Sequence, residues 1–402
     1  MAEKKRIVME VDYADLAWHG FSREKLERFF EKTARAGMRE MYWSVTCCGL
    51  AEYHSRIMPW YDGRDRRVGS RSCAATIHAY DGLAAAVELG KTYGVRIIPY
   101  FRMFDDYFSG MVDEYIDGLP GGWWESRCGH FQLRGWPSYW LDEVRDYKLR
   151  IVAEIASYGI DAMLFGLTRS HSLYVNPFRQ PHFWGYNQPV ADEFRRRHGV
   201  DIRKFDYIDH EVTSEGPFAW KDLMFVHRYN YVGAEAFDLP AWHALKGEYS
   251  IRFIREARKL LGPKPHVAIE ASHFACLPFA DPADEFPAKH TFDPAALARE
   301  GVIDEWTVSW NWRPGGFDFD RPLLPAFQPV LDAGAIITLW LNDFFSPTGG
   351  EFAKHVTPQD VETYLARVLE SKFPSASIHE ADFLLQNPHA EEIWKVFERM
   401  LG

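Results

Sequence analysis

The segment DEVRDYKLRIVAEIASYGIDAMLFGLTRS, residues 142–170, contains one complete step from a helix to a strand. Apolar residues recur at helical spacing in its first part, and Gly159 ends the helix, as glycine commonly does. The apolar run that follows predicts a buried strand over 161–168, and polar residues come directly after it. This order of helix, glycine, buried strand and polar loop is typical of folds that alternate helices with parallel strands.

The same kind of strand recurs along almost the whole chain. Amphipathic stretches such as SREKLERFFEKTARAG and TPQDVETYLARVLES separate most of the strands. Eight alternations in 402 residues predict an α/β fold, a single (β/α)8 TIM barrel that spans residues 1–402 as one domain. The predicted strands lie at 6–12, 39–46, 95–101, 161–168, 265–271, 305–310, 335–341 and 376–381.

The long connections all follow predicted strand ends. They are the loops 47–78 and 104–140 and a large helical excursion at about 169–245. These segments would gather at the C-terminal face of the barrel, where barrel enzymes carry their active sites. Asp161, Asp304 and Glu305 instead stand at strand starts, so we expect them at the opposite end, in structural roles.

Composition narrows the functional classes. The net charge of −11 argues against nucleic-acid binding, and no apolar run approaches the roughly 18–20 residues of a membrane span. Five cysteines without C-x-x-C spacing favour free thiols in a reducing compartment. We therefore expect a cytoplasmic protein, with a secreted protein whose signal has been removed as the alternative, and leave a homo-oligomer open.

Aromatic residues are unusually frequent, at 16% of the chain with 15 Trp. Many Trp residues fall near strand ends or in loops, where flat apolar faces suit the packing of sugar rings. Core packing between strands and helices is the alternative for any single Trp. Taken together they favour a carbohydrate cleft, with stacking expected from Trp43, Trp310, Trp312 and Trp340.

Three stretches carry a resemblance to a known family. The segment 142–170, the stretch WGYNQPVADEFRRRHGVDIRKFD and the C-terminal IHEADFL resemble the family-10-like glycosyl hydrolases, found mostly in bacteria. The resemblance implies a carbohydrate-active barrel. Members of that family often carry an acid at the end of strand 4, where this chain has Gly166, so the resemblance assigns no catalytic residue there.

Cleavage of a glycosidic bond needs two carboxyl groups on either side of it. Glu270 is the principal candidate, because it ends the apolar run HVAI in a confined setting of the kind that suits a general acid. A buried Glu270 paired with Arg102 or Arg169 is the structural alternative. Asp343, after strand 7, is the preferred partner, with a solvated Asp343 as its alternative.

Other polar residues at strand ends would bind the substrate, a small oligosaccharide. Arginine binds carboxylates and sulfates well. Arg102 and Arg169, together with Arg64, Arg66, Arg67 and Arg71 in the preceding loop, therefore leave open an acidic sugar as the substrate. A solvated loop rich in arginine is the alternative. Asp105 could instead cap the segment that follows it. The expected binding residues are Asp12, Arg102, Asp105, Arg169, His171, His273, Asn342 and Glu380.

No metal or cofactor is expected, because the histidines form no H-x-H or H-E-x-x-H pattern, although Glu270, His273 and Asp343 could hold a divalent ion. Neither a nucleophile elbow nor a phosphate loop is present. The sequence thus predicts a glycoside hydrolase. A metal-dependent sugar isomerase or lyase on the same barrel and an inactive carbohydrate-binding protein are the alternatives.

Overall fold

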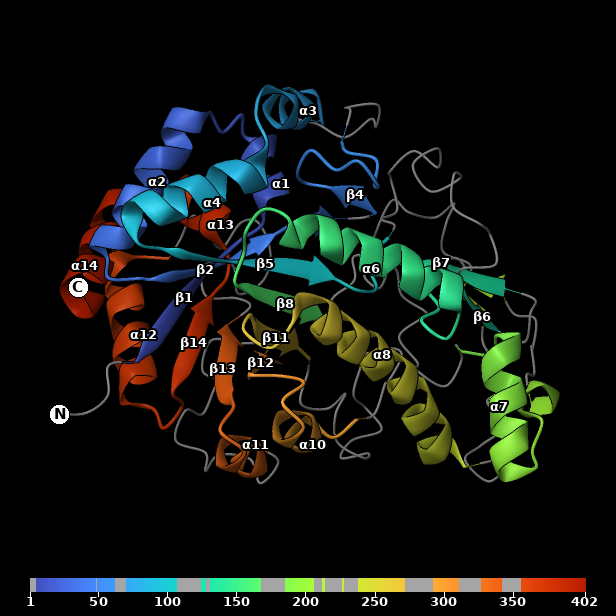
Figure 1. Ribbon diagram of the computed structural model, residues 1–402. Helices are drawn as coiled ribbons and strands as arrows, with labels where there is room; N and C mark the ends of the chain where they lie inside the picture. Colours follow the sequence, from blue (N-terminus) through green and yellow to red (C-terminus); the bar gives the residue numbers. More distant parts are fainter. Residues whose placement is uncertain are drawn as a thin grey trace.

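The computed structural model describes residues 5–47, 49–61, 70–106, 124–127, 131–167, 185–205, 212–213, 226–227, 238–271, 292–310, 327–341 and 356–402. Within these ranges a closed barrel of eight parallel strands forms the centre of the molecule (Figure 1). Its strands are β1 (Arg6–Val11), β2 (Glu40–Ser44), β5 (Arg96–Arg102), β8 (Ala162–Gly166), β11 (His266–Glu270), β12 (Glu305–Trp310), β13 (Ile336–Leu341) and β14 (Ser375–Ile378).

All eight predicted strands are confirmed, within one or two residues at most ends. Each strand is hydrogen-bonded to the next one along the chain, and β1 pairs with both β2 and β14. Pairing of the first strand with the last leaves the sheet without an edge. The sequence therefore encodes the closed barrel through the order of its buried runs.

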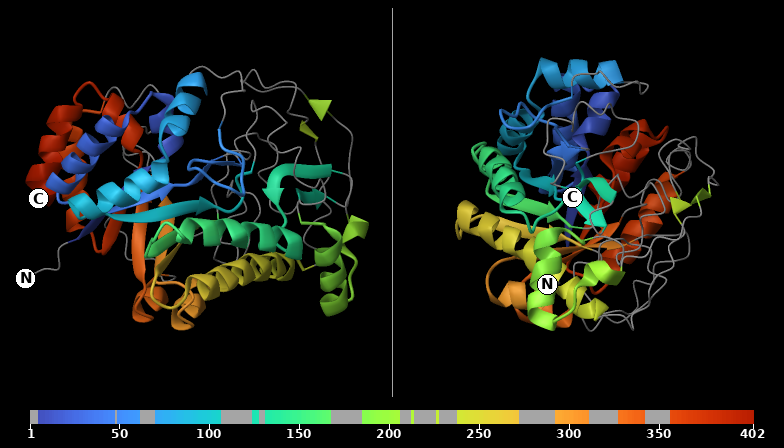
Figure 2. Two further views of the ribbon diagram at one scale, coloured as in Figure 1. Left: turned by 45° about the horizontal axis from the view of Figure 1, so that its top comes forward. Right: turned by 90° about the vertical axis from the view of Figure 1, so that its right-hand side faces the viewer.

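Helices cover the outside of the barrel (Figures 1 and 2). The helices between or after strands are α1 (Tyr13–Trp18), α2 (Arg23–Arg35), α3 (Ser70–Ala79), α4 (Gly82–Tyr93), α6 (Asp142–Ala156), α7 (Gln188–His198), the 3-10 helix η4 (Ile202–Phe205), α8 (Leu239–Leu261), α10 (Pro294–Arg299), α11 (Gln328–Asp332), α12 (Pro358–Glu370), α13 (Ala381–Gln386) and α14 (Ala390–Leu401). No helix in the described ranges is both long and apolar enough to cross a membrane.

Side-chain caps fix where several helices begin. Ser22 accepts a hydrogen bond from the Lys25 amide at the start of α2, and Thr357 forms a capping box with Asp360 at the start of α12. Gly37 follows α2 at a φ of +78°, and a Cβ there would stand 2.4 Å from the Leu401 carbonyl oxygen. This close approach of the chain's last helix explains the glycine that ends α2.

Small two-stranded sheets lie on the C-terminal side of the barrel. They are the two-stranded pairs β3 (Thr46–Cys47) with β4 (Leu50–Ala51), β6 (Trp124–Arg127) with β7 (Phe131–Pro137), and β9 (Val212–Thr213) with β10 (Val226–His227). In Figure 1 both chain termini lie at the left, while β6, β7 and α7 lie at the right, toward which β5 points. The long connections predicted at 47–78 and 104–140 thus contain α3 and a hairpin.

Three apolar clusters hold these layers together. The largest lies between the strands and the surrounding helices. A second joins α7 to α8 through Trp140, Phe194 and Trp242, within the predicted excursion and its flanks. The third fills the barrel itself with Val8, Tyr42, Ile98, Tyr100, Ala162, Leu164, Ala268 and Trp340. Membership of this inner cluster shows which strand side chains point into the barrel.

Candidate active site at the carboxyl ends of the strands

Strand alternation places polar side chains above the inner apolar cluster. Val8, Tyr100 and Ala268 point into the barrel, so the residues two positions later on the same strands point inward as well. These are Glu10, Arg102 and Glu270, at the carboxyl ends of β1, β5 and β11. Glu305 instead begins β12, so it lies at the amino end of the barrel.

Glu270 lies in this upper layer with no exposed surface. Its register partners are Gly166 on β8 and Thr307 on β12. Gly166 in turn pairs with Arg102, so an inward Glu and an inward Arg stand on either side of a position without a side chain. Glu270 is thus a buried, inward-pointing carboxyl, and its role in catalysis stays a prediction.

The ring of Tyr100 fills the space that a side chain at position 166 would take. A Cβ built on Gly166 would stand 2.7 Å from both Cε2 and the hydroxyl of Tyr100, which is closer than real Cβ contacts. An acid at the end of β8 would have to displace this ring. Gly166 is therefore required by the packing of the upper barrel, and carboxyl groups must come from other strands.

Arg102 is committed to the protein around it. Its guanidinium donates to Asp12 Oδ2 at 2.6 Å, to the Ser44 hydroxyl at 3.1 Å and to the Thr46 carbonyl at 3.1 Å. Asp12 and Arg102 are both almost fully buried, so the ion pair ties β5 to the end of β1 away from water. This contact network fits a positioning role for Arg102, whereas the expectation was a hydrogen bond to substrate.

His379 links the two strands that close the barrel. Its Nδ1 contacts the Glu10 carboxylate on β1, and its Nε2 lies 3.2 Å from Glu380 Oε2. Burial raises the pKa of Glu380 well above its usual range, and the nearby carboxyls of Asp15, Asp382, Glu10 and Asp12 raise it further. Glu380 thus stands, as predicted, at the seam between strands 1 and 8, among other acids.

Two more buried carboxyls complete this group. Burial, followed by the nearby Asp15 and Asp12, raises the pKa of Asp382 in α13 to about 8. Burial also raises the pKa of Glu52 well above its usual range, with the charge of Asp12 adding to the effect. We refer to Glu10, Asp12, Asp15, Glu52, Glu380 and Asp382 together as the acidic cluster.

Sequence reasoning selected part of this cluster and missed the rest. Asp12 and Glu380 are among the predicted binding residues, and Glu10 and Asp382 also stand near strand ends. Asp15 lies one helical turn beyond β1, and Glu52 lies in a connection without periodicity. The closure of β1 on β14 brings these segments together, and no local motif signals it.

Two of the predicted stacking residues are corrected by the structure. Trp43 has no exposed surface and stacks on Tyr13 at 5.3 Å between ring centroids, with Phe30 at 6.2 Å, in the layer between strands and helices. Because Tyr42 points into the barrel, its neighbour on the strand must point out. Trp43 is thus a core residue, and its expected contact with sugar is wrong.

Trp340 does point into the barrel, but it packs the interior. Its ring is fully buried, parallel to Tyr42 at 5.6 Å and beside Tyr100 at 5.3 Å. His379 lies 6.0 Å above this stack. The expected stacking of a sugar on Trp340 is therefore also wrong in this structure. Trp340 instead belongs to the buried layer that lies beneath Glu10 and His379.

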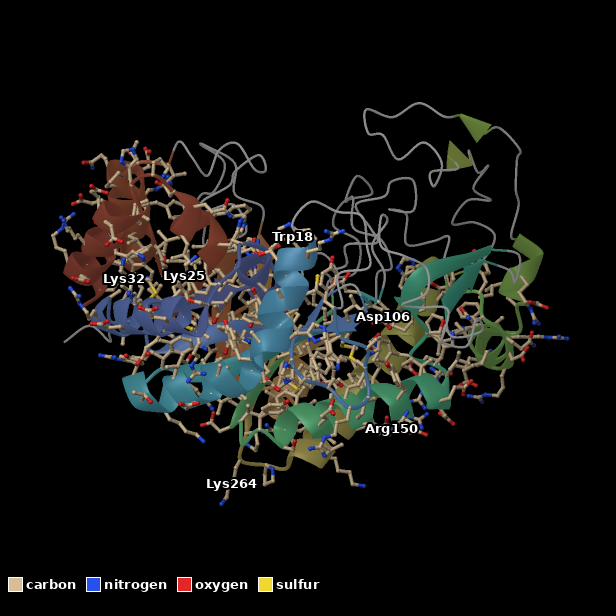
Figure 3. The ribbon with its side chains drawn as sticks, turned by 90° about the horizontal axis from the view of Figure 1, so that it is seen from above. Trp18, Lys25, Lys32, Asp106, Arg150 and Lys264 are labelled. Carbon is tan, nitrogen blue, oxygen red and sulfur yellow. The ribbon has the colours of Figure 1, made fainter. Side chains whose placement is uncertain are left out.

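The remaining predictions have mixed outcomes. Asp105 is buried, and its carbonyl oxygen accepts a hydrogen bond from the Gly49 amide at 2.8 Å. The neighbouring Asp106, labelled in Figure 3, accepts one from Lys148 at 2.5 Å. The backbone of Trp310 ends β12, but its side chain is not described. Six other predicted residues lie outside the described part of the chain, namely Arg169, His171, His273, Trp312, Asn342 and Asp343.

The amino end of the barrel contrasts with this site. Glu305 accepts hydrogen bonds from Arg6 at 2.7 Å and from Thr338 at 2.5 Å, contacts the Tyr42 hydroxyl, and lies 2.7 Å from His266. Burial would raise the pKa of Glu305, but Arg6 and His266 outweigh it and hold the pKa well below the usual range. Glu305 is thus the structural acid that its position at a strand start predicts.

Solved structures share this architecture. The chain matches the catalytic domain of a β-amylase from Paenibacillus polymyxa with a TM-score of 0.55 and 11% identity, covering 98% of this chain and 97% of that one. It matches a β-N-acetylhexosaminidase from Bacteroides fragilis with a TM-score of 0.53 and 9% identity, covering 99% of this chain and 66% of that one. Both share the barrel fold with this chain. At such identities the likeness extends to the fold alone.

No protein family matches the chain in sequence, and no curated protein does. The resemblance to family-10-like glycosyl hydrolases accordingly stays a prediction. The β-amylase and the β-N-acetylhexosaminidase named above are glycoside hydrolases built on the barrel that the sequence predicts.

Proposed function

We propose that this protein is a glycoside hydrolase that cleaves an oligosaccharide with a pair of carboxyl groups at the carboxyl end of its barrel. The observation that carries the proposal is the position of Glu270, an inward-pointing carboxyl at the end of β11. Active sites of (β/α)8 enzymes lie at this end of the barrel. Fold and site together favour this reaction class, since the structural neighbours are glycosidases as well.

Glu270 would serve as one of the two acids, and Asp343 remains the preferred partner. Asp343 follows the last residue of β13 by two positions in the sequence, and the carboxyl end of β13 belongs to the same end of the barrel as Glu270. One carboxyl group would protonate the departing oxygen while the other attacks the sugar or activates water. Glu270→Gln keeps the shape of the side chain and removes this proton chemistry.

The test is a hydrolysis screen of the purified protein against aryl glycosides and neutral and uronate-bearing oligosaccharides. We expect the wild type to release sugar and Glu270→Gln to lose activity on oligosaccharides by at least a thousandfold. The exposed residue Glu392 supplies the matched control, because Glu392→Gln makes the same chemical change on the surface of α14. Saturable sugar binding without turnover by the wild type would contradict the hydrolase and favour a carbohydrate-binding protein.

Asp343 is tested separately from Glu270. Asp343→Asn should lower kcat on the same substrate by two or more orders of magnitude, while leaving the unfolding midpoint close to that of the wild type. Unchanged kcat in Asp343→Asn, with activity lost in Glu270→Gln, would keep the proposed reaction and remove Asp343 from it. An acid from β1 or β14 would then be the next partner to examine.

A further inference from the structure

Glu52 is a buried carboxyl group at the carboxyl end of the barrel. It follows β4 directly, and its backbone amide donates to the Val45 carbonyl at 3.0 Å, next to the end of β2. Glu52 is 2% exposed, and within the described residues neither of its carboxylate oxygens accepts a hydrogen bond. An ionised carboxylate in this place would lose its hydration without replacement, so the neutral form is favoured.

The charges around Glu52 also decide which form it takes. A carboxylate oxygen of Asp12 and the sulfur of Cys47 lie within 4.8 Å of a Glu52 carboxylate oxygen. Burial is the largest cause that raises the pKa of Glu52, and the charge of Asp12 comes next, whereas Arg102 lowers the pKa in part. Among the described residues, the titratable and charged groups that face Glu52 are Asp12, Tyr13 and Asp15 around the start of α1, Cys47 on β3 and Arg102 on β5.

Arg102 has a donor that none of the described residues accepts. Its two terminal nitrogens donate to Asp12, to the Ser44 hydroxyl and to the Thr46 carbonyl, but its Nε is buried without an acceptor in this part of the chain. The Ser44 hydroxyl accepts from Arg102, so its own hydrogen can still be donated. It is also close enough to Glu52 to lower the pKa of that carboxyl in part.

We propose that Glu52 carries a proton in the folded protein at neutral pH, and that loss of this proton switches the ion pair between Arg102 and Asp12. While Glu52 is neutral, the guanidinium donates to Asp12 as observed. When the O–H bond of Glu52 breaks, the proton passes to water and the electron pair stays on the carboxylate. The Ser44 hydroxyl and the Nε–H of Arg102 then donate to Glu52, and Asp12 shares the guanidinium with a second carboxylate.

This switch lies at the same end of the barrel as Glu270. Arg102 is the register partner of Gly166, and Gly166 is the register partner of Glu270. A change in the contacts of Arg102 would therefore reach the layer that carries the candidate site. The inference does not rest on the proposed function, because the proton on Glu52 is measured on the protein without substrate.

Urea unfolding of the full chain between about pH 5 and about pH 7.5 tests the proton on Glu52. The unfolded chain releases this proton near pH 4.5 while the folded protein keeps it, so wild-type stability falls as the pH rises above that value. Glu52→Gln keeps a neutral side chain of the same shape and removes this fall. We expect the ratio of unfolding equilibrium constants, wild type over Glu52→Gln, to rise at least tenfold across the range. The exposed control Glu392→Gln should give a constant ratio.

Infrared difference spectra give a direct readout of the same proton. At neutral pH, the wild type minus Glu52→Gln should show the C=O band of one protonated carboxyl group. Glu52→Met is a second neutral variant for both measurements, in case the amide at this position impairs folding. A constant ratio of unfolding constants together with the absence of this band would overturn the proposal, because Glu52 would then be ionised at neutral pH.

The coupling to the ion pair is tested in an Asp12→Asn background. Removing the nearby carboxylate and releasing Arg102 to Glu52 should favour ionised Glu52, so the rise in the ratio with pH should shrink at least threefold. Asp146→Asn, on the exposed face of α6, is the matched control and should leave the rise unchanged. A rise that persists undiminished in Asp12→Asn would overturn the switch, since Arg102 would then not be shared between the two carboxyl groups.

Discussion

At the scale of single residues, the absence of a side chain at Gly166 leaves room in the barrel for the ring of Tyr100. The Cβ of any other residue would overlap the ring at 2.7 Å. Gly166→Ala should destabilise the protein by about 1–3 kcal/mol, the usual cost of overpacking a tight core. Denaturant unfolding measures this change.

A second substitution separates overpacking from other effects of Gly166→Ala. Tyr100→Phe retains the ring edge that would clash, whereas Tyr100→Leu removes it. We expect Tyr100→Leu to recover part of the lost stability when combined with Gly166→Ala, and Tyr100→Phe to recover little. Equal, additive losses in both double variants would show that the Tyr100 ring is not the obstacle.

Glu305 gives a residue-level prediction about pH. Its pKa lies below the unfolded value of 4.5 in the folded protein, so its ionised form contributes stability above that value, and the contribution is lost as the pH falls. Glu305→Gln should cost about 3 kcal/mol at neutral pH, since it leaves Arg6 and His266 without their shared partner.

The difference between Glu305→Gln and the wild type should narrow as the pH is lowered from 7 to about 3. Urea unfolding at several pH values measures it, with Glu392→Gln as the exposed control. A difference that stays constant over this range would mean that the charge of Glu305 is not what stabilises the amino end of the barrel.

At the scale of elements, two aspartates that cap helices differ in the number of segments to which they are hydrogen-bonded. Asp81 caps α4 through the Ala84 amide at 2.9 Å, and it also accepts bonds from the His54 amide at 3.1 Å and the Tyr158 hydroxyl at 2.7 Å. Asp238 caps α8 through the Ala241 amide at 3.0 Å, and within the described residues its side chain accepts no other hydrogen bond. Asp81 therefore joins three segments, whereas Asp238 begins a helix.

Asp81→Ala should cost about 2–3 kcal/mol, against about 1 kcal/mol for Asp238→Ala, because each additional hydrogen bond contributes roughly 1 kcal/mol. Thermal and chemical unfolding of the two variants under the same conditions provides the comparison. Equal losses in the two proteins would contradict the bridging role of Asp81.

The helices and strands also differ in how well sequence patterns predict them. The eight strands could be predicted because each is a short buried run between turns, and long amphipathic helices such as α2 and α12 could be predicted from their periodicity. Helix α1 has six residues and begins two residues after β1, which is too short for a helical period to stand out. The β6–β7 hairpin lies in a connection that carries no clear alternation.

Strand alternation explains the errors at the candidate site. Position near a strand end suggested Trp43, but side chains alternate between the two faces of a strand, so Tyr42 and Ser44 face the interior and Trp43 faces the helices. Glu270 has the parity that points inward. The end of a strand thus locates a site only when it is combined with the face on which the residue lies.

At the scale of the whole molecule, the two ends of the barrel separate structure from chemistry. The amino end holds a hydrogen-bonded network around Glu305, while Glu270 and the acidic cluster lie at the carboxyl end. Figure 2 shows the additional elements on that same side, away from the termini. Which acids meet there depends on barrel closure, so the group could not be predicted from local sequence.

The central claim is that this barrel hydrolyses glycosides with Glu270 as one of its acids, and leaving-group dependence tests it most directly. A general acid matters most when the departing group is a poor one. We predict that Glu270→Gln loses at least a thousandfold in kcat/KM on an oligosaccharide, and much less on an aryl glycoside with an acidic phenol, while Glu392→Gln matches the wild type. Equal kcat/KM for Glu270→Gln and the wild type on both substrates would contradict the account.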